Sequence, residues 1–424
     1  MVPLNYSDMK NLLLALFLVC CNLFFSISFC QTKVQLVEAS DYCFNIYKQI
    51  HQNPELGKNE IKTSALIKEE LKKMGYGTLI EIPILPTCVI AELDTKKPGP
   101  VIAFRAELDA KKGKEETGLP YASKLNLSHS CGHDAHASIL LATAKLLMSV
   151  KGNLKGKIYF IFQPAEEIAG GADDIVNSGK LEELGIKNIF ALHSAPNLTV
   201  GKLSISPGYT MAGSNYFSIV VEAKESHAAE PFRGDNMPIK LSQLIPNITA
   251  IPATKMSTTS RPCVISVTYI GMGDTLVKNL NTIPGRAVIK GTIRSYEDIK
   301  KRFDNQPSIE ELIKTEISAV FSEVNNSDKI FSKGAPATIN DETLYYTIIT
   351  KLTKIYSGKI VPSERYMFSE DFSYYTEKIP CLYFGWGITK DDFGVADVHT
   401  TKFSIHPDAF IYGIELFADI ATIQ

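Results

Sequence analysis

Two groups of residues in this sequence are of the types that bind metal ions and transfer protons. The first is the segment SCGHDAH (130–136), in which a cysteine and a histidine stand two positions apart. A thiolate and an imidazole at this spacing can bind one metal site. They suit zinc, and nearby carboxylates widen the choice to manganese or cobalt. The alternative is an ordinary helix start with a packed cysteine and solvated histidines.

The second group is the pair Glu166-Glu167, which follows the apolar run KIYFIF and a proline. One carboxylate of such a pair can bind a metal ion while the other accepts a proton from a water molecule activated there. The alternative is an acidic pair at a helix start, where the helix dipole favours negative charge. The position after a predicted strand favours the catalytic interpretation.

Further polar residues follow other apolar runs. PVIAFRAEL leads into Asp109, NIFAL leads into His193, and CLYFGWG is followed by His399. In open α/β sheets, ligands bind beyond the carboxyl ends of the strands, so residues far apart in the sequence can meet there. The remaining histidines considered are expected in surface or turn positions: His51, His129, His406 and, at the end of another strand, His227.

Taken in chain order, a series of short motifs resembles one known family. The motifs are HQNPEL (51–56), FRAELDA (104–110), GLPYASK (118–124), SCGHDAH (130–136), QPAEE (163–167), ALH (191–193), SHAAEP (226–231), NTIP (281–284), GTIR (291–294), SEDFS (369–373) and VHTTKF (398–403). Each is weak alone, but their order is specific. From about His51 to its C-terminus the chain resembles the aminoacylase/hippuricase/auxin-conjugate hydrolase group of metal-dependent amidohydrolases, within the dinuclear exopeptidase superfamily.

The resemblance implies two divalent metal ions per subunit, with manganese as first choice and zinc or cobalt as alternatives. The implied metal ligands are Cys131, His133, Glu167, His193 and His399, with Cys131 between the two ions. Glu166 is the implied general base. Asp109 would be a carboxylate that orients a metal ligand, as such sites generally need.

The resemblance also implies residues that contact the substrate. His227 would stabilise the oxyanion, reaching the site from an inserted domain and, in some relatives, across a homodimer. Asn281 and Arg294 would hold the substrate carboxylate, for which the two-pronged guanidinium is suited. The chain departs from the family pattern at Lys111–Glu116, where relatives usually continue with Leu-Pro, and at Phe232, where a second histidine is common. These departures concern the substrate pocket rather than the metal ligands.

The elements that would position these residues form an α/β fold. Apolar runs alternate with helical stretches, which predicts a mixed, mostly parallel sheet flanked by helices. Residues 35–75 and 131–150 have helical patterns. Strand-like YFSIVVEAK, VISVTYI and AVIKGTIRSY surround a helix-like segment after Pro207. We therefore expect a catalytic domain from residues 32–211 and 331–424, and an inserted α+β dimerisation (lid) domain at 212–330.

The whole chain has the composition of a soluble globular protein, with 424 residues, 45% hydrophobic and 21% charged residues, and a net charge of −2. Nothing in it suggests a nucleic-acid partner. The apolar run Leu12–Ser28 follows Lys10, which predicts a signal peptide over residues 1–30; the alternative is a membrane anchor. After removal of the signal peptide five cysteines would remain: Cys43, Cys88, Cys131, Cys263 and Cys381. Because this number is odd, at least one of them is unpaired.

The sequence therefore predicts an exported amidohydrolase, secreted, periplasmic or in the lumen of a secretory pathway, with no stable membrane insertion after removal of the signal. It would remove the acyl group from an N-acyl amino acid or trim a C-terminal residue from a short peptide. Two alternatives stay open. One is a catalytically inactive relative that acts as a binding protein, and the other is a structural protein whose metal only stabilises the fold.

Overall fold

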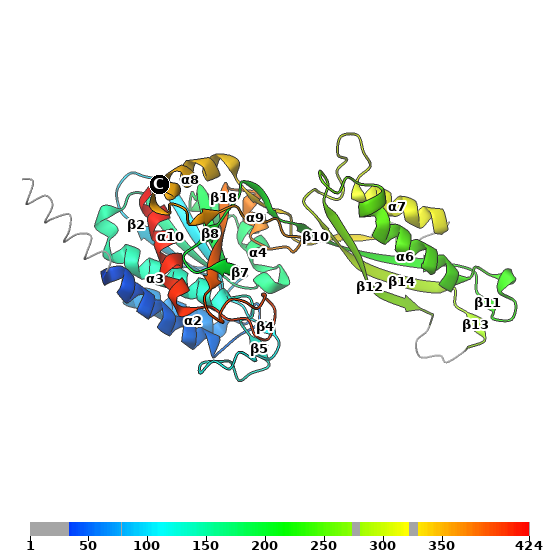
Figure 1. The fold of residues 1–424 in the computed structure, drawn as a ribbon, viewed down its shortest axis with the longest axis horizontal. Coiled ribbons are helices and arrows are strands. Elements are labelled where there is room, and N and C mark those ends of the chain that lie inside the picture. Colours follow the sequence, from blue (N-terminus) through cyan, green and yellow to red (C-terminus); the bar gives the residue numbers. More distant parts are fainter. Residues whose placement is uncertain (1–33, 78, 274–279, 322–329, 424) are drawn as a thin grey trace, which may run out of the picture.

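The computed structural model in Figure 1 describes residues 34–77, 79–273, 280–321 and 330–423. The predicted signal peptide, with its alternative of a membrane anchor, lies outside the described residues. Among the described helices, none combines the length and the apolar character that crossing a lipid bilayer requires. Within the described part of the chain all five cysteines are free thiols.

The larger body is built around an eight-stranded mixed sheet. In spatial order its strands are β1 (Leu79–Ile80), β2 (Val89–Asp94), β6 (Lys157–Gln163), β3 (Val101–Glu107), β7 (Asn188–Thr199), β18 (Cys381–Thr389), β8 (Leu203–Ser204) and β17 (Ile360–Val361). The four central strands β6, β3, β7 and β18 are mutually parallel. The side chains of β6, β3 and β18 are almost all buried, as expected for parallel strands covered on both faces, whereas β7 is buried mainly in its first half. The predicted α/β class is confirmed.

Helices cover both faces of this sheet (Figure 1). One face packs against the helix through residues 34–51, α2 (Ile61–Lys73), α3 (His133–Ser149), α8 (Glu342–Ile355) and α10 (Phe410–Ile423). The other packs against α4 (Gly171–Asn177), α5 (Lys180–Glu183) and α9 (Ser373–Thr376). The prediction of one helical stretch over 35–75 was wrong in one respect. The chain leaves the helix at residues 52–60, where Pro54 and Gly57 disfavour its continuation.

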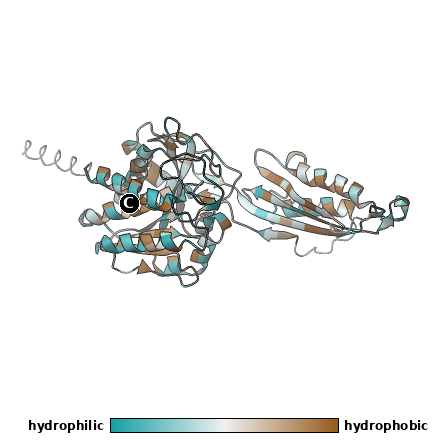
Figure 2. Cartoon of the chain, turned by 90° about the horizontal axis from the view of Figure 1, so that it is seen from below, coloured by the Kyte–Doolittle hydropathy of each residue, from teal (hydrophilic) through white to brown (hydrophobic). Residues whose placement is uncertain are grey.

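A second body has its own sheet and its own core. Its antiparallel strands are β12 (Cys263–Met272), β14 (Arg286–Ser295), β10 (Gly213–Glu222) and β15 (Phe331–Lys333). They pack against α6 (Met237–Thr254) and α7 (Ile309–Val320) through a separate apolar cluster. Figure 2 shows these helices lying along one side of the sheet, with brown and teal segments alternating along them. β15 pairs with β10, so this sheet extends to Lys333, three residues past the expected boundary at 330.

Short elements complete both bodies. β9 (Gly208–Met211) pairs with β16 (Thr338–Asn340) where the chain leaves and re-enters the larger body. β4 (Lys111–Lys112) pairs with β5 (Leu127–Ser128), and β11 (Ser226–His227) pairs with β13 (Thr282–Ile283). The 3-10 turns are η1 (Lys151–Asn153), η2 (Glu166–Ile168), η3 (Pro231–Arg233) and η5 (Pro407–Ala409). Of these, β4, β5 and η2 bear directly on the candidate site.

Candidate active site

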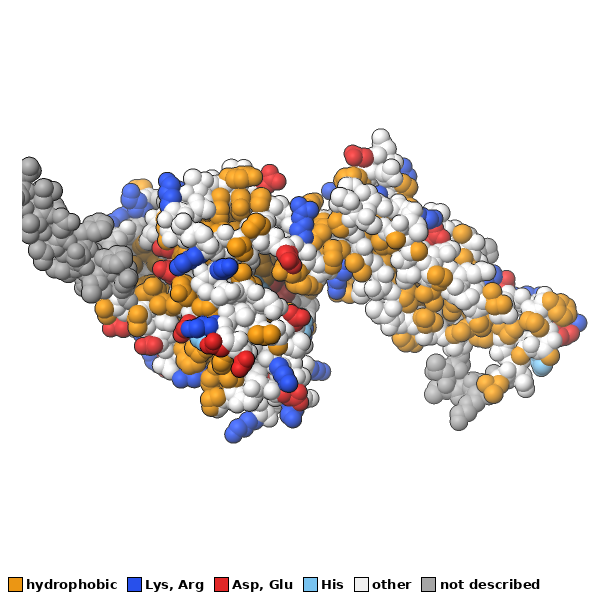
Figure 3. All heavy atoms as spheres, viewed as in Figure 1, with side chains coloured by type: hydrophobic (Ala, Val, Ile, Leu, Met, Phe, Trp, Pro, Cys, Tyr) orange, Lys and Arg blue, Asp and Glu red, His pale blue; other side chains and the backbone are white. Residues whose placement is uncertain are grey.

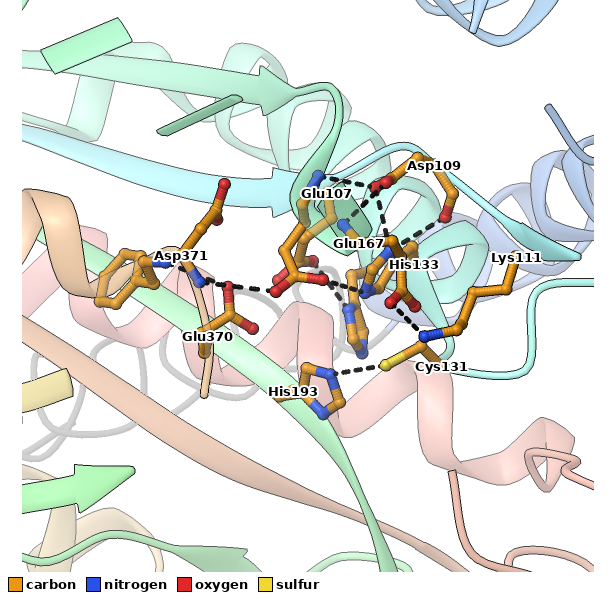
Figure 4. Close-up of polar contacts among 12 residues, drawn as sticks. Glu107, Asp109, Lys111, Cys131, His133, Glu167, His193, Glu370 and Asp371 are labelled. Atoms are coloured by element: carbon orange, nitrogen blue, oxygen red, sulfur yellow. Dashed lines mark hydrogen bonds and ion pairs between the residues drawn. The ribbon is translucent and has the colours of Figure 1, made fainter. Parts of the chain in front are cut away.

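The candidate site lies at the edge of the large sheet where the parallel strands β6, β3 and β7 present their carboxyl ends. Asp109 follows β3, and the Glu166-Glu167 pair opens η2 just after β6. His193 differs from expectation, because it lies within β7, which continues to Thr199 instead of ending before the histidine. Figure 4 shows the side chains of Asp109, Glu167 and His193 grouped in one cluster with those of Cys131 and His133.

Cys131 and His133 are brought into the cluster by the turn that starts α3. Gly132 has φ +88°, in the left-handed region where glycine carries little strain, and a Cβ there would lie 2.9 Å from the Ser194 hydroxyl oxygen. The turn places the Cys131 Sγ atom 3.3 Å from the His193 Nε2 atom. Cys131, His133 and His193 thus lie together beside the tight turn at Gly132.

The imidazoles of His133 and His193 are oriented alike. The Nδ1 atom of His133 lies 2.9 Å from the carbonyl oxygen of Asp109, and the Nδ1 atom of His193 lies 2.9 Å from the carbonyl oxygen of Ser194. Both carbonyls are acceptors, so each Nδ1 atom is the N–H donor and each Nε2 atom keeps a lone pair. This is the usual arrangement of histidines that ligate metals.

The described residues fit divalent metal ions by a second criterion. The His133 Nε2 atom is buried without a hydrogen-bond partner, a costly state unless another group satisfies it. Among the described residues, five groups of three donor side chains have ligand atoms within 4.8 Å of one another. Two of these sets contain Cys131: Cys131 with His133 and His193, and Cys131 with Glu167 and His399. Thiolate, imidazole and carboxylate donors at these separations suit zinc, manganese or cobalt, and Cys131 belongs to both sets.

The two adjacent glutamates have opposite electrostatic environments. Burial, and then the carboxylates of Glu370 and Asp371, raise the pKa of Glu166 well above its usual value. Burial also opposes ionisation of Glu167, but His399, His133 and Lys111 outweigh it and lower the pKa of Glu167 to about 2. Two carboxyls with pKa values pushed apart are typical of a proton-transferring group beside a permanently charged one.

Asp109 holds in place the turn that carries Glu166 and Glu167, here called the glutamate turn. Its Oδ1 atom accepts the Glu166 N–H at 3.1 Å and its Oδ2 atom accepts the Glu167 N–H at 2.9 Å. The same carboxylate lies 3.3 Å from the Nδ1 atom of His133. The turn starts at Ala165, whose φ of +61° is strained for a residue other than glycine. Asp109 therefore connects the turn that carries both glutamates to His133.

His399 reaches the cluster from the loop after β18. It also has a strained φ, +63°, and its N–H donates to the Ser130 carbonyl at 2.6 Å. Its Nε2 atom lies 3.4 Å from the Oε1 atom of Glu167. The Lys111 ammonium lies 2.7 Å from the Oε2 atom of Glu167, so the departure at Lys111–Glu116 reaches the cluster itself.

A buried polar network beneath the cluster was not assigned a role from the sequence. The Arg105 guanidinium contacts Glu107, Glu370 at 2.9 Å, Asp371 at 2.7 Å and Gln163 at 2.8 Å. The Nδ1 atom of His136 lies 2.9 Å from a Glu107 oxygen, and its Nε2 atom accepts the Ser194 N–H at 2.9 Å. The available signal was an arginine inside the otherwise apolar run PVIAFRAEL. A charge at such a position is buried only with partners.

The expected surface position of two histidines was wrong. His51 is buried, with its Nδ1 atom 2.6 Å from an Asp134 oxygen and its Nε2 atom 3.1 Å from a Glu115 oxygen. His129 is also buried. The burial of His51 could not be predicted from its local sequence, because its partners come from other parts of the chain.

The residues expected to contact the substrate lie in the second body. His227, in β11, is exposed and lies at the end of this body farthest from the large sheet in Figure 1. The carbonyl oxygen of Asn281 accepts the Ala228 N–H at 2.8 Å, beside His227. Arg294, in β14, packs over the Tyr216 ring at 6.0 Å, and its Nη1 atom is buried without a hydrogen-bond partner. Phe232 is 80% exposed.

Comparisons with known proteins place the chain among metal-dependent peptidases and amidohydrolases. The family model of peptidase family M20/M25/M40 matches residues 103–422. The chain is 35% identical to the N-acetyl-L-cysteine deacetylase of Bacillus subtilis (89% of this chain, 87% of the relative). It is 32% identical to IAA-amino acid hydrolase ILR1-like 4 of Arabidopsis thaliana (90% and 85%). Among solved structures, the YXEP protein of Bacillus subtilis, described as a dinuclear metal-binding peptidase, superposes with a TM-score of 0.74 at 28% identity (91% and 98%).

Proposed function

The chain belongs to peptidase family M20/M25/M40, and from this membership we propose that it removes the acyl group from N-acyl amino acids or the C-terminal residue from short peptides. The family and the relatives make it a metal-dependent hydrolase of amide bonds. The N-acyl amino acid is the narrower part of the proposal. It is supported by relatives named for N-acetyl-L-cysteine deacetylation and for hydrolysis of IAA-amino acids.

In the proposed reaction, Glu166 accepts a proton from water as the oxygen attacks the amide carbon, and then donates that proton to the leaving nitrogen. Two divalent ions, when bound, supply Lewis-acid polarisation of the carbonyl and lower the pKa of water. The residues that would hold them are Cys131, His133, Glu167, His193 and His399. Asp109 would hold the backbone of Glu166 and Glu167 in position. His227 would donate a hydrogen bond to the oxyanion of the tetrahedral intermediate.

The observation that carries this proposal is the contrast between the two glutamates. Glu166 has a raised pKa and lies 3.8 Å from the Nε2 atom of His133, whereas Glu167 is held as an anion. A carboxyl with a raised pKa retains a proton more readily at neutral pH, which a group that must first take and then give a proton requires.

Replacing the base is the direct test. We expect Glu166→Gln to lower kcat on N-acyl amino acids by about 10²- to 10⁴-fold while metal content stays unchanged, because the amide cannot accept the proton. Glu182→Gln, at an exposed position of α5, is the matched control and should behave as the wild type. Wild-type activity in Glu166→Gln would refute this role, whereas a loss of metal would mean that Glu166 is a ligand.

The substrate carboxylate would be held by Arg294 and Asn281. The buried, unpartnered Nη1 atom of Arg294 supports this part, since an anion would satisfy it. Manganese is the first choice of metal, with zinc or cobalt next. A panel of N-acyl amino acids, the matching amides without a free carboxylate, and dipeptides, each assayed with several divalent metals, would test both points. Equal rates with and without the carboxylate would exclude the anchoring role.

We also propose that the enzyme acts as a homodimer. β12 is an edge strand of the second sheet and carries the exposed side chains Val264, Tyr269 and Ile270. Figure 3 shows hydrophobic side chains gathered over this body. An open strand edge with apolar side chains is suited to pairing with a second copy. Light scattering that found a fully active monomer would exclude the dimer.

The last part of the proposal is export. It rests on the apolar run Leu12–Ser28 after Lys10. We expect the mature protein to begin after Cys30, at Gln31. N-terminal sequencing of the protein recovered from the exporting cell would test this, and an intact Met1 would contradict it.

A further inference from the structure

Lys111 is anchored beside the proposed metal site by its position in the backbone. It begins β4, two residues after Asp109, and pairs with Ser128 of β5. Three residues after Ser128 the chain reaches Cys131. The backbone of Lys111 is thus fixed between two segments that build the site.

The Lys111 side chain extends into the cluster (Figure 4). Its Nζ atom lies 2.7 Å from the Oε2 atom of Glu167 and 3.4 Å from the Nδ1 atom of His399. The Glu167 side chain is only 9% exposed and that of Lys111 is 31% exposed. This ion pair is therefore partly shielded from water. Charges in such a partly buried position interact more strongly than charges at an open surface.

The two sets of donor atoms that contain Cys131 differ in their contact with the Lys111 ammonium. Glu167 and His399, which Lys111 contacts, form one set with Cys131. In the other set, the imidazole N–H groups of His133 and His193 face backbone carbonyls, and both of these side chains are held without the ammonium. A divalent cation bound by Glu167 would face the ammonium at a separation of a few ångströms, where like charges repel.

We propose that Lys111 is an internal cation that competes with the metal ion at the Cys131–Glu167–His399 position, so that the two ions of this enzyme bind with unequal affinity. The inference rests on the proposed function, because it assumes that these residues bind metal. The ion at Cys131, His133 and His193 binds first and tightly. The second ion binds only as Lys111 leaves Glu167, and its affinity is reduced by that exchange.

Calorimetric titration of the metal-free full chain with Mn²⁺ tests this inference. For the wild type we expect two steps that differ by at least about tenfold in affinity. Lys111→Met keeps the aliphatic stem and removes the charge, so the second step should tighten by about tenfold or more while the first stays the same. Lys112→Met removes a charge from the next, exposed residue and is the matched control. It should titrate as the wild type does.

The outcomes separate this inference from the proposed function. Two wild-type steps of equal affinity, or a second step that Lys111→Met leaves unchanged, would overturn the role of Lys111 alone. Equal tightening in Lys112→Met would overturn it too, because a general charge effect would then suffice. Failure of all three proteins to bind Mn²⁺, Zn²⁺ or Co²⁺ would overturn the metal site and the inference together. Circular dichroism of each variant verifies that the fold is retained.

Discussion

At the scale of single residues, Asp109 is the side chain on which most of the cluster geometry depends. It accepts the N–H groups of Glu166 and Glu167 and lies against the ring of His133. Asp109→Asn has one acceptor oxygen in place of two and no charge. We expect metal affinity to fall about 10- to 100-fold, as for other residues that orient metal ligands.

Competition with a chromophoric chelator measures this affinity. Asp392→Asn, in an exposed turn after β18, is the control and should bind metal as the wild type does. If Asp109→Asn kept wild-type affinity, the hydrogen bonds from the glutamate turn would not be what positions the ligands.

His51 gives a prediction for stability against pH. Burial alone would lower the pKa of His51, but Asp134 and Glu115 outweigh it and raise the pKa to about 10. The unfolded value is about 6.5, so the folded state binds the extra proton between these limits. The stabilisation is therefore complete below pH 6.5 and is lost as the pH rises through about 10, a contribution on the order of 1–3 kcal/mol.

Thermal unfolding of the metal-free protein between pH 7 and pH 10 checks this. The wild-type unfolding temperature should fall across the range. His51→Gln should be less stable at pH 7 and should show a shallower fall, since it has no proton to lose. Parallel curves for the two proteins would show that His51 is neutral in the folded state.

What the sequence reveals at this scale depends on whether a residue belongs to a local motif. Glu166 and His399 stand in short motifs after predicted strands, and Cys131 stands at the start of a predicted helix, so their meeting could be expected. The contact of Lys111 with Glu167 could not, because the direction of a long side chain depends on the β4–β5 pairing around it. The burial of His51 depends on Asp134 and Glu115, which are 83 and 64 residues away.

At the scale of elements, the short connection between η2 and α4 controls where the glutamates lie. α4 begins at Gly171, and a Cβ at this position would lie 1.7 Å from the carbonyl oxygen of Pro164. Gly171→Ala must push the segment that carries Glu166. We expect the free energy of unfolding to fall by about 1–3 kcal/mol, and hydrolysis to fall with it.

Gly152→Ala is the matched control, because a Cβ at Gly152 would meet no atom within 4 Å. Thermal unfolding and activity are measured on both variants. Wild-type stability in Gly171→Ala would mean that the segment relaxes without cost and that its position does not set the activity.

Among the elements, length decided what the sequence could predict. The buried strands β3 and β6 and the helix α3 were expected from their long apolar patterns. β4, β5, β8 and β17 have two residues each, too few for a periodic pattern, and exist through pairing with neighbours. The end of β7 was misplaced because hydrophobicity stops near His193, while hydrogen bonding to β18 continues to Thr199.

At the scale of the whole molecule, the described chain separates the proposed chemistry between two bodies. The base and the metal ligands belong to the large sheet, whereas His227 lies in β11 of the second body, away from them (Figure 1). The contact that would stabilise the oxyanion must therefore come from a rearrangement of the chain or from another subunit. The apolar edge strand β12 on the same body favours the second explanation.

Mixing two inactive variants distinguishes these explanations. Glu166→Gln lacks the base and His227→Ala lacks the oxyanion donor, so each homodimer should have little activity. If His227 acts across the dimer, a hybrid has one site with Glu166 of one subunit and His227 of the other. Random reassortment in equal amounts makes half of the dimers hybrids with one working site each, so about a quarter of the wild-type activity should return. Each variant incubated alone is the control. Without recovery after verified subunit exchange, His227 would have to act within its own chain or take no part in the reaction.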